Sequence, residues 1–290
     1  MGSQSELTIA SYDTGKSPTW CPGCGDFGIW ISLKNALVKM GLGPDDVFLV
    51  YGIGCHGNMY SWMKTYACEG LHGRTLPVAQ GIKLANHPLP VIIISGDGDG
   101  LGEGGNHFIH AAKRNPNVTV ILHDNQLYSL TTGQASPTAK PGFKTKSTPE
   151  GVYDEPINPL TMSIAAGATY VARGFAGDAA YLTQLIVDAV NHKGFSLVDI
   201  LQPCVTFDKI HTYAYYRQRV YRLDAEGYKP DNKATALAKA FEWGDRIPTG
   251  VFYQEEKPTS EDREAAIAEL PLVAQPLEIP DIDSMLAEFI

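Results

Sequence analysis

The sequence predicts an α/β fold in which helices cover both faces of a parallel sheet. Short, continuously apolar runs such as VIIIS at residues 91–95 have the composition of strands buried on both faces. Stretches whose apolar residues recur at helical spacing lie between these runs. Because strands and helices alternate in this way, we expect neighbouring strands to run parallel and to be connected through helices.

The composition argues against several classes of protein. The 290 residues allow one large α/β domain or two smaller ones. A formal net charge of −9 argues against non-specific nucleic-acid binding, which needs a basic surface. No apolar run approaches the length of about 18 residues that a membrane span needs, and the N-terminal residues lack the pattern of a secretory signal. We therefore expect a cytoplasmic protein that binds neither nucleic acid nor membrane.

Local patterns place the expected elements along the chain. The first helix is expected to use Asp26 as its cap and to end at Gly41, since apolar residues recur between them at helical spacing. A second helix passes through Phe108, and a third has Asp178 as its expected cap and Gly194 as its end. Buried strands are expected over residues 47–54, 91–95, 118–123 and 195–201.

Two segments break the alternation. Residues 126–155 are rich in Thr, Ser, Pro, Gly and Lys and predict a long loop of the kind that is usually functional or disordered. Hydroxyl groups at residues 129–138 either border an active site or bind the loop backbone. From residue 208 the pattern weakens into a Tyr- and Arg-rich helix over residues 213–223 and a Pro- and Glu-rich tail. We expect one domain over residues 1–207 and a C-terminal extension over 208–290 that packs on the core or on a partner.

A glycine turn directly follows the strand at residues 91–95. Gly96 and Gly98 let backbone N–H groups approach a phosphate, but Asp97 between them would repel a bare diphosphate. A divalent cation between the carboxylate and the phosphates resolves this conflict, because Mg²⁺ prefers one or two protein oxygens together with phosphate oxygens. The end of the next strand supplies a second oxygen ligand, Asn125.

The spacing from Gly96 to Asn125 resembles the thiamine-diphosphate and magnesium motif of pyruvate decarboxylases, transketolases and their relatives. The resemblance implies that the side chains of Asp97 and Asn125 and the backbone carbonyl of Leu127 hold Mg²⁺. Asp99 either contacts the cofactor or is a solvated turn carboxylate.

Four of the five cysteines are expected at one edge of the sheet. Cys21 and Cys24 precede the first helix, whereas Cys55 and Cys204 follow strands whose carboxyl ends converge. Four thiolates suit either zinc or a 4Fe-4S cluster, and the CPGC pair alone also suits a redox dithiol. Geometry leaves these alternatives open. Cys68 has the pattern of a small buried hydrophobic residue, and its role stays open.

The expected cofactor favours the cluster. Thiamine diphosphate makes a 2-oxo acid electron-rich, and a one-electron acceptor close by can then oxidise it. A 4Fe-4S cluster is such an acceptor, whereas zinc has no redox chemistry and would be purely structural.

Several motifs together resemble the β subunit of the 2-oxoacid:ferredoxin oxidoreductases: WCPGCGDFGI, GIGCHG, HGRTLPVAQGIKLA, SGDGDGLGEGGNHFIHAAKRN, DNQLYSLTTGQASPT, QPCVTF and IPTGVFY. The resemblance implies a thiamine-diphosphate-binding fold that carries Mg²⁺ and one 4Fe-4S cluster. It implies that the cluster ligands are Cys21, Cys24, Cys55 and Cys204. In this family the activating glutamate lies on a separate α subunit, so the catalytic residues of this chain stay unknown and the chain alone is expected to be inactive.

The reaction that the resemblance implies is the coenzyme A-dependent oxidative decarboxylation of a 2-oxo acid, with electrons passing to ferredoxin. The length and the C-terminal IPTGVFYQEEKPT resemble the two-subunit 2-oxoglutarate type, which forms succinyl-CoA and CO₂ and can run in reverse to fix CO₂. A pyruvate or broad-specificity enzyme is the alternative, and a non-redox thiamine enzyme with structural zinc is a further one. We expect an αβ pair that dimerises.

The turns after the strands supply the other residues expected at the cofactor. His56 and His72 either contact a proton or phosphate or make only structural hydrogen bonds. The complete expected set is Gly54, Cys55, His56, His72, Gly96, Asp97, Gly98, Asp99, Asn125, Leu127 and Tyr128.

Overall fold

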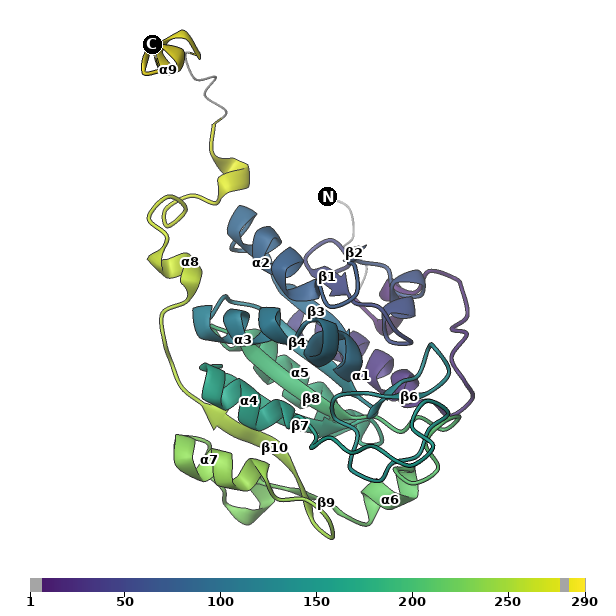
Figure 1. Cartoon of the computed structure of the whole chain (residues 1–290). Helices are drawn as coiled ribbons and strands as arrows, with labels where there is room; N and C mark the ends of the chain where they lie inside the picture. Colours follow the sequence, from purple (N-terminus) through teal and green to yellow (C-terminus); the bar gives the residue numbers. More distant parts are fainter. Residues whose placement is uncertain (1–6, 277–281, 290) are drawn as a thin grey trace.

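A computed structural model describes residues 7–276 and 282–289. Its main sheet has eight strands in the order β2-β1-β3-β4-β8-β7-β10-β9 (Figure 1). Every neighbouring pair is parallel except β10 with β7, which is antiparallel. The predicted parallel α/β architecture is therefore confirmed, with one antiparallel addition. The strands are β1 (Phe48–Tyr51), β2 (Tyr66–Glu69), β3 (Val91–Gly96), β4 (Thr119–Asp124), β7 (Tyr170–Phe175), β8 (Ser196–Leu201), β9 (Val220–Arg222) and β10 (Ile247–Gln254).

Helices cover both faces of this sheet, because its strands are apolar on both sides. Ile92 and Ile94 of β3 pack in a core with α1 (Gly25–Met40) and α5 (Ala179–Asn191). Val91 and Ile93 point the other way and pack in a second core. The helices of that second core are α2 (Thr75–Ala85), α3 (Gly105–Arg114), α4 (Pro159–Ala166) and α7 (Lys233–Ala240).

The start of α1 differs from the prediction. The helix begins at Gly25 with Cys24 at the cap position, and the Gly25 N–H donates to the Pro203 carbonyl at 3.1 Å. Asp26 lies inside the first turn, fully buried, so the expectation that it caps the helix is wrong. Its carboxylate is committed to other side chains. The helix ends as predicted at Gly41, which has φ of 71°.

The predicted strands all coincide with strands of the sheet, although β1 is shorter than expected because the chain turns at Gly52. Asp178 caps α5 as predicted and accepts from the Tyr181 N–H at 3.2 Å. The expected long loop contains a small hairpin formed by β5 (Leu127–Tyr128) and β6 (Gln134–Ala135).

The chain beyond residue 208 continues the sheet. The predicted Tyr- and Arg-rich helix is much shorter than expected, because α6 (Tyr213–Arg217) is followed by strand β9. β10 then lies between β9 and β7. The short helical segments elsewhere are η1 (Ile9–Tyr12), η2 (Gly57–Ser61), η3 (Gly98–Glu103), η4 (Asp224–Glu226), α8 (Ser260–Arg263), η5 (Leu272–Ala274) and α9 (Ile282–Ala287).

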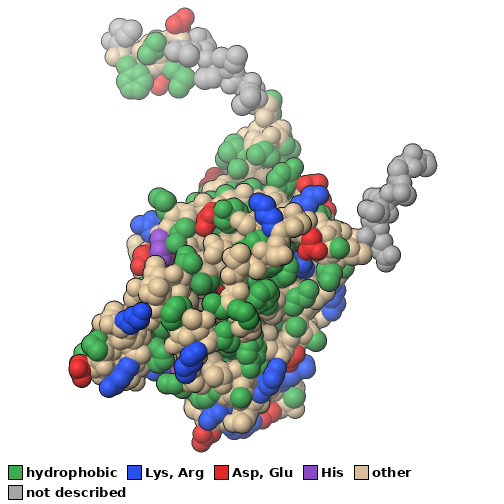
Figure 2. All heavy atoms as spheres, turned by 90° about the vertical axis from the view of Figure 1, so that its right-hand side faces the viewer, with side chains coloured by type: hydrophobic (Ala, Val, Ile, Leu, Met, Phe, Trp, Pro, Cys, Tyr) green, Lys and Arg blue, Asp and Glu red, His purple; other side chains and the backbone are tan. Residues whose placement is uncertain are grey.

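The surface offers no single dominant charge patch on the face drawn in Figure 2, where Lys and Arg side chains are scattered among apolar and acidic ones. Among the described residues, no helix is long and apolar enough to cross a membrane.

Candidate cofactor and cluster site

The turns that follow β1, β3 and β4 meet at one edge of the sheet. These strands are neighbours, with Tyr51 opposite Ile94 and Gly96 opposite His123. A cavity of about 70 Å³ opens between the turns. All of the expected cofactor residues line it, namely Gly54, Cys55, His56, His72, Gly96, Asp97, Gly98, Asp99, Asn125, Leu127 and Tyr128.

Asp97 is held in this cavity by two hydroxyl groups. Ser136 Oγ and Thr138 Oγ1 donate to Asp97 Oδ2 at 2.6 and 2.7 Å. Burial raises the pKa of Asp97, and the two hydroxyls act against that shift. The carboxylate is 1% exposed, so an unpaired negative charge there is costly. A bound cation would remove that cost.

Asn125 and Leu127 supply the other oxygens predicted for Mg²⁺. Asn125 Oδ1 accepts from the Leu127 N–H at 3.0 Å and from Ser129 Oγ at 3.1 Å, while its Nδ2 donates to Gln202 Oε1 at 3.1 Å. Carboxylate, amide and carbonyl oxygens are the hard donors that Mg²⁺ prefers, so this donor set fits the ion. Within the described chain, no group of three or more His, Cys, Asp or Glu side chains is placed to hold a metal ion.

Of the two alternatives for Asp99, a cofactor contact or a solvated turn carboxylate, the structure contradicts the second. It is 2% exposed. Its oxygens accept from the Ile53 N–H at 3.2 Å, the Gly73 N–H at 2.7 Å and Ser95 Oγ at 2.6 Å. Asp99 therefore fixes the turn after β1 and the start of α2 against β3.

His56 is a neutral acceptor within the turns. Its Nε2 accepts from the Gly96 N–H at 2.9 Å. Burial and then the neighbouring His123 lower the pKa of His56 to about 4. A Cβ at position 96 would lie 2.7 Å from the His56 ring, so the turn requires glycine there. His72 is more exposed, and its Nδ1 lies 3.2 Å from Asp99 Oδ1.

The four cysteines line a second cavity of about 290 Å³ beside the first one. They are Cys21, Cys24, Cys55 and Cys204, all free thiols. Cys55, Ser129 and Leu130 line both cavities, so the two share a wall. Cys68 lies on β2 and lines neither.

Two of the thiols in this cavity, Cys24 and Cys204, are buried, whereas Cys55 is half-buried and Cys21 is exposed. Cys24 Sγ donates to Asp26 Oδ2 at 3.3 Å, and burial followed by the charge of Asp26 raises the pKa of Cys24. The same two causes raise the pKa of Cys55 to about 12. A soft, positively charged iron centre favours thiolate over thiol. Four thiols are the donors that a 4Fe-4S cluster uses, but in the described residues these four line the cavity without converging as a metal-binding group.

The contact between Asp26 and His123 could not be read from the sequence. Asp26 binds His123, both fully buried, although the sequence had suggested a capping role for Asp26. Ser136 and Thr138 bind Asp97, whereas Thr131 Oγ1 bonds its own loop at the Tyr128 carbonyl. The sequence predicts that hydroxyls of residues 129–138 either border an active site or bind the loop backbone, and Ser136 and Thr138 do the first while Thr131 does the second.

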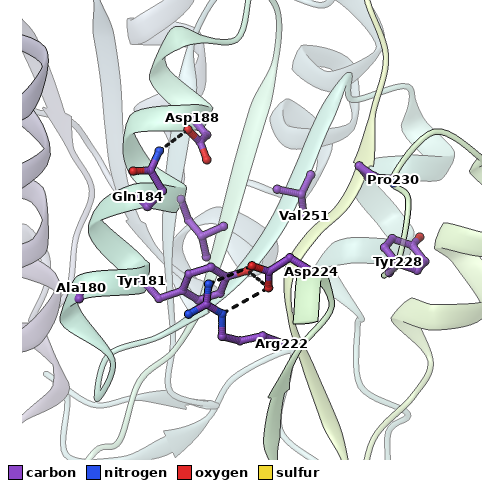
Figure 3. Close-up of a pocket in the computed structure, with 10 residues that line it drawn as sticks. Ala180, Tyr181, Gln184, Asp188, Arg222, Asp224, Tyr228, Pro230 and Val251 are labelled. Carbon is purple, nitrogen blue, oxygen red and sulfur yellow. Dashed lines mark hydrogen bonds and ion pairs between the residues drawn. The ribbon is translucent and has the colours of Figure 1, made fainter. Parts of the chain in front are cut away.

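A separate hollow of about 470 Å³ lies between α5 and the β9–β10 region and contains none of the expected residues (Figure 3). Its charges are paired internally. Arg222 Nη2 lies 2.9 Å from Asp224 Oδ2 and the guanidinium stacks 3.7 Å from the Tyr181 ring. Tyr181 also donates to Asp224 Oδ1 at 3.1 Å.

Two family models match the chain. Residues 52–200 match the thiamine pyrophosphate enzyme C-terminal TPP-binding domain. Residues 204–269 match the C-terminal part of the pyruvate ferredoxin oxidoreductase beta subunit.

Curated relatives and a solved structure are similar along most of the chain. A 2-oxoacid:ferredoxin oxidoreductase subunit beta of Saccharolobus solfataricus is 48% identical over 82% of both chains. A 2-oxoglutarate synthase subunit KorB of Archaeoglobus fulgidus is 41% identical over 66% of this chain and 71% of its own. A 2-oxoglutarate:ferredoxin oxidoreductase from Magnetococcus marinus, solved with 2-oxoglutarate, coenzyme A and succinyl-CoA bound, has a TM-score of 0.90 at 36% identity and covers 99% of this chain and 97% of its own.

Proposed function

Because this chain belongs to the β subunits of the 2-oxoacid:ferredoxin oxidoreductases, we propose that it holds thiamine diphosphate, Mg²⁺ and a 4Fe-4S cluster in an enzyme that oxidises 2-oxoglutarate. The observation that carries the proposal is the wall shared by the two cavities. A substrate site and a one-electron acceptor must lie close together for electrons to leave the substrate, and Cys55 borders both cavities.

The residues of the first cavity support a role in holding the diphosphate through its metal. Asp97, Asn125 and the Leu127 carbonyl would bind Mg²⁺, with Ser136 and Thr138 keeping the Asp97 carboxylate in place. His56 would hold the Gly96 turn rigid without adding charge, since it is a neutral acceptor. Cys21, Cys24, Cys55 and Cys204 would bind the cluster.

When bound, thiamine diphosphate supplies the decarboxylation of the 2-oxo acid and the cluster supplies one-electron transfer. In the proposed overall reaction, the bond to the carboxylate breaks to release CO₂ and a thioester forms between the remaining acyl group and coenzyme A. Two electrons pass to two ferredoxins, and the coenzyme A thiol releases its proton. The reverse reaction fixes CO₂.

Two observations support 2-oxoglutarate as the substrate. The relatives from Archaeoglobus fulgidus and Mycobacterium tuberculosis carry 2-oxoglutarate names, and the Magnetococcus marinus structure binds 2-oxoglutarate. A second candidate is pyruvate, because the family model over residues 204–269 is named for a pyruvate enzyme.

We further propose that an α subunit completes the enzyme in the cytoplasm. The relatives are named as β subunits, which supports a partner that carries the activating glutamate. Ferredoxin and coenzyme A are the other proposed partners, and the αβ pair is expected to dimerise. Residues 1–207 would bind the cofactors, and residues 208–290 would pack on the core or on that partner.

The test is to purify the chain anaerobically with its α subunit and to measure viologen reduction with 2-oxoglutarate, pyruvate and a branched 2-oxo acid. We expect a brown protein, bleached by dithionite, that is fastest with 2-oxoglutarate. A rate with pyruvate far above the rate with 2-oxoglutarate would overturn the proposal that 2-oxoglutarate is the substrate. A colourless protein with stoichiometric zinc would overturn the redox function.

A further inference from the structure

A third cavity, of about 240 Å³, lies outside the proposed cofactor site. It opens between the sheet, the loop that follows β6 and the chain after α7. Its polar side chains are Asp124, Gln126, Thr138, Lys140, Glu155, Asn158, Arg173 and Trp243. None of them is expected at thiamine diphosphate or the cluster, although Thr138 also donates to Asp97 of the proposed cofactor site.

Arg173 on β7 brings a buried cation to this cavity. It is 2% exposed, and its Nε donates to Asp199 Oδ2 at 2.9 Å. Its Nη1 is also buried but has no hydrogen-bond partner among the residues that the structure describes. An unused donor on a buried guanidinium is costly, because the group has lost its water.

Lys140 and Trp243 add two more donors. Lys140 Nζ lies 3.9 Å from the centre of the Trp243 ring, and the Arg173 guanidinium carbon lies 5.2 Å from the same ring. No carboxylate of residues 7–276 or 282–289 makes an ion pair with Lys140. The indole Nε1 of Trp243 is buried and, within those residues, also lacks a partner. Two cations and an N–H thus line one small space.

The acidic side chains that line this cavity make no hydrogen bond with these three donors, although the charge of Asp124 acts on both Arg173 and Lys140. Asp124 Oδ1 lies 2.8 Å from Thr138 Oγ1, whose single hydrogen is donated to Asp97, and it accepts from the Gln126 N–H at 3.3 Å. Glu155 is exposed to solvent. In the hollow of Figure 3, by contrast, Arg222 donates to Asp224 through both Nε and Nη2, whereas among the described residues Arg173 donates to Asp199 through Nε alone.

We propose that this cavity binds a short organic acid, whose carboxylate accepts hydrogen bonds from Arg173, Lys140 and Trp243. A carboxylate matches the planar donors of a guanidinium and has enough lone pairs for all three groups. The volume is below the range of about 300–1,000 Å³ typical of drug-sized ligands, which fits an acid of a few carbons. Ile157 and Phe241 provide apolar walls for its carbon chain.

This site is independent of the proposed function, since its three donors are placed outside both of the other cavities. It is tested by isothermal titration calorimetry of the full chain with succinate, propionate and inorganic phosphate at constant ionic strength. We expect saturable binding of at least one carboxylate. Lys140→Gln and Trp243→Phe should each weaken it about tenfold or more, because each loses a donor to a charged group.

Arg222→Gln is the matched control, because it removes a cation from a hollow whose charges are already paired. Its affinity for the carboxylate should equal that of the unmodified chain. Intrinsic fluorescence gives a second readout, with a carboxylate-dependent change that is lost in Trp243→Phe.

Three results would each overturn the proposal. The first is that the folded, unmodified chain binds no carboxylate. The second is that Lys140→Gln and Trp243→Phe both bind the carboxylate as tightly as the unmodified chain does. The third is that the chain binds phosphate but neither carboxylate. Equal thermal unfolding midpoints of the variants would establish that a weakened affinity does not come from unfolding.

Discussion

Asp26 Oδ1 and His123 Nδ1 are joined by a hydrogen bond of 2.7 Å, and neither side chain is exposed. The other oxygen of Asp26 accepts from Cys24 Sγ at 3.3 Å. One carboxylate thus connects the helix that begins beside the cysteine cavity to the strand that ends beside Asn125. We infer that it keeps the two predicted cofactor sites in register.

Asp26→Asn should lower the free energy of unfolding by about 1–3 kcal/mol, because the amide offers only one acceptor to two buried donors. Urea unfolding of the cluster-free chain measures this. Asp262→Asn is the matched control, since Asp262 pairs with Lys193 at 36% and 65% side-chain exposure and should cost less than about 1 kcal/mol. Equal losses in the two variants would contradict a central role for Asp26.

Cys24→Ser should greatly reduce the iron and acid-labile sulfide bound per chain, because a hydroxyl is a poor substitute for a thiolate at iron. Cys68→Ser should leave both unchanged, since Cys68 lines neither cavity. Metal analysis of anaerobically purified protein gives the result. Full iron in Cys24→Ser, or equal iron loss in both variants, would remove Cys24 from the ligand set.

Thr138→Val should weaken magnesium-dependent binding of thiamine diphosphate several-fold, because it deletes a hydroxyl that lies 2.7 Å from Asp97 Oδ2. Thr131→Val deletes a hydroxyl that bonds only its own loop and should change the affinity little. Calorimetric titration of the cofactor at fixed Mg²⁺ compares them. The idea fails if the two variants bind alike.

Lys83 should make stability depend on alkaline pH. Its side chain is 2% exposed, Nζ donates to the Leu89 carbonyl at 2.8 Å, and burial lowers the pKa of Lys83 to about 8. Between pH 8 and 10.5, the usual pKa of a lysine, the unfolded chain binds more protons at Lys83 than the folded chain does. The free energy of unfolding therefore rises with pH across this range. The contribution of Lys83 to stability is complete above pH 10.5 and is lost as the pH falls through 8.

Lys83→Met removes that proton linkage. Relative to Lys83→Met, the unmodified chain should therefore gain about 2 kcal/mol in the free energy of unfolding between pH 7 and pH 10. Urea titrations at the two pH values measure the difference. Lys39→Met, at a surface position of α1, should show no such dependence. If the difference in the free energy of unfolding between Lys83→Met and the unmodified chain were the same at both pH values, the lowered pKa of Lys83 would be contradicted.

The central strands and the site edge could be predicted from the sequence because both depend on local patterns. The runs around Val91 and Val118 are buried on both faces and are apolar throughout. The turns after them carry the polar residues, and parallel strands bring those turns together. The grouping of Asp97, Asn125, Cys55 and Cys204 follows from this geometry, whereas the inclusion of Cys21 and Cys24, which precede α1, is implied by the family resemblance.

Contacts between distant residues could not be predicted in the same way. An acidic residue in a first helical turn is a normal capping signal, and only the approach of His123 gives Asp26 its actual partner. The segment after Tyr213 has helical composition, but Val220 and Tyr221 pair with β10 instead. Tertiary pairing overrode local propensity there.

The wall formed by Cys55, Ser129 and Leu130 also limits how this protein can vary. A side chain that faces two compartments cannot be shortened without changing both, so residues of this wall are poor positions for altering substrate range. Positions that line the thiamine cavity alone, such as Ile53 or Thr131, do not line the cysteine cavity. Redesign of this chain for another 2-oxo acid would begin at those positions.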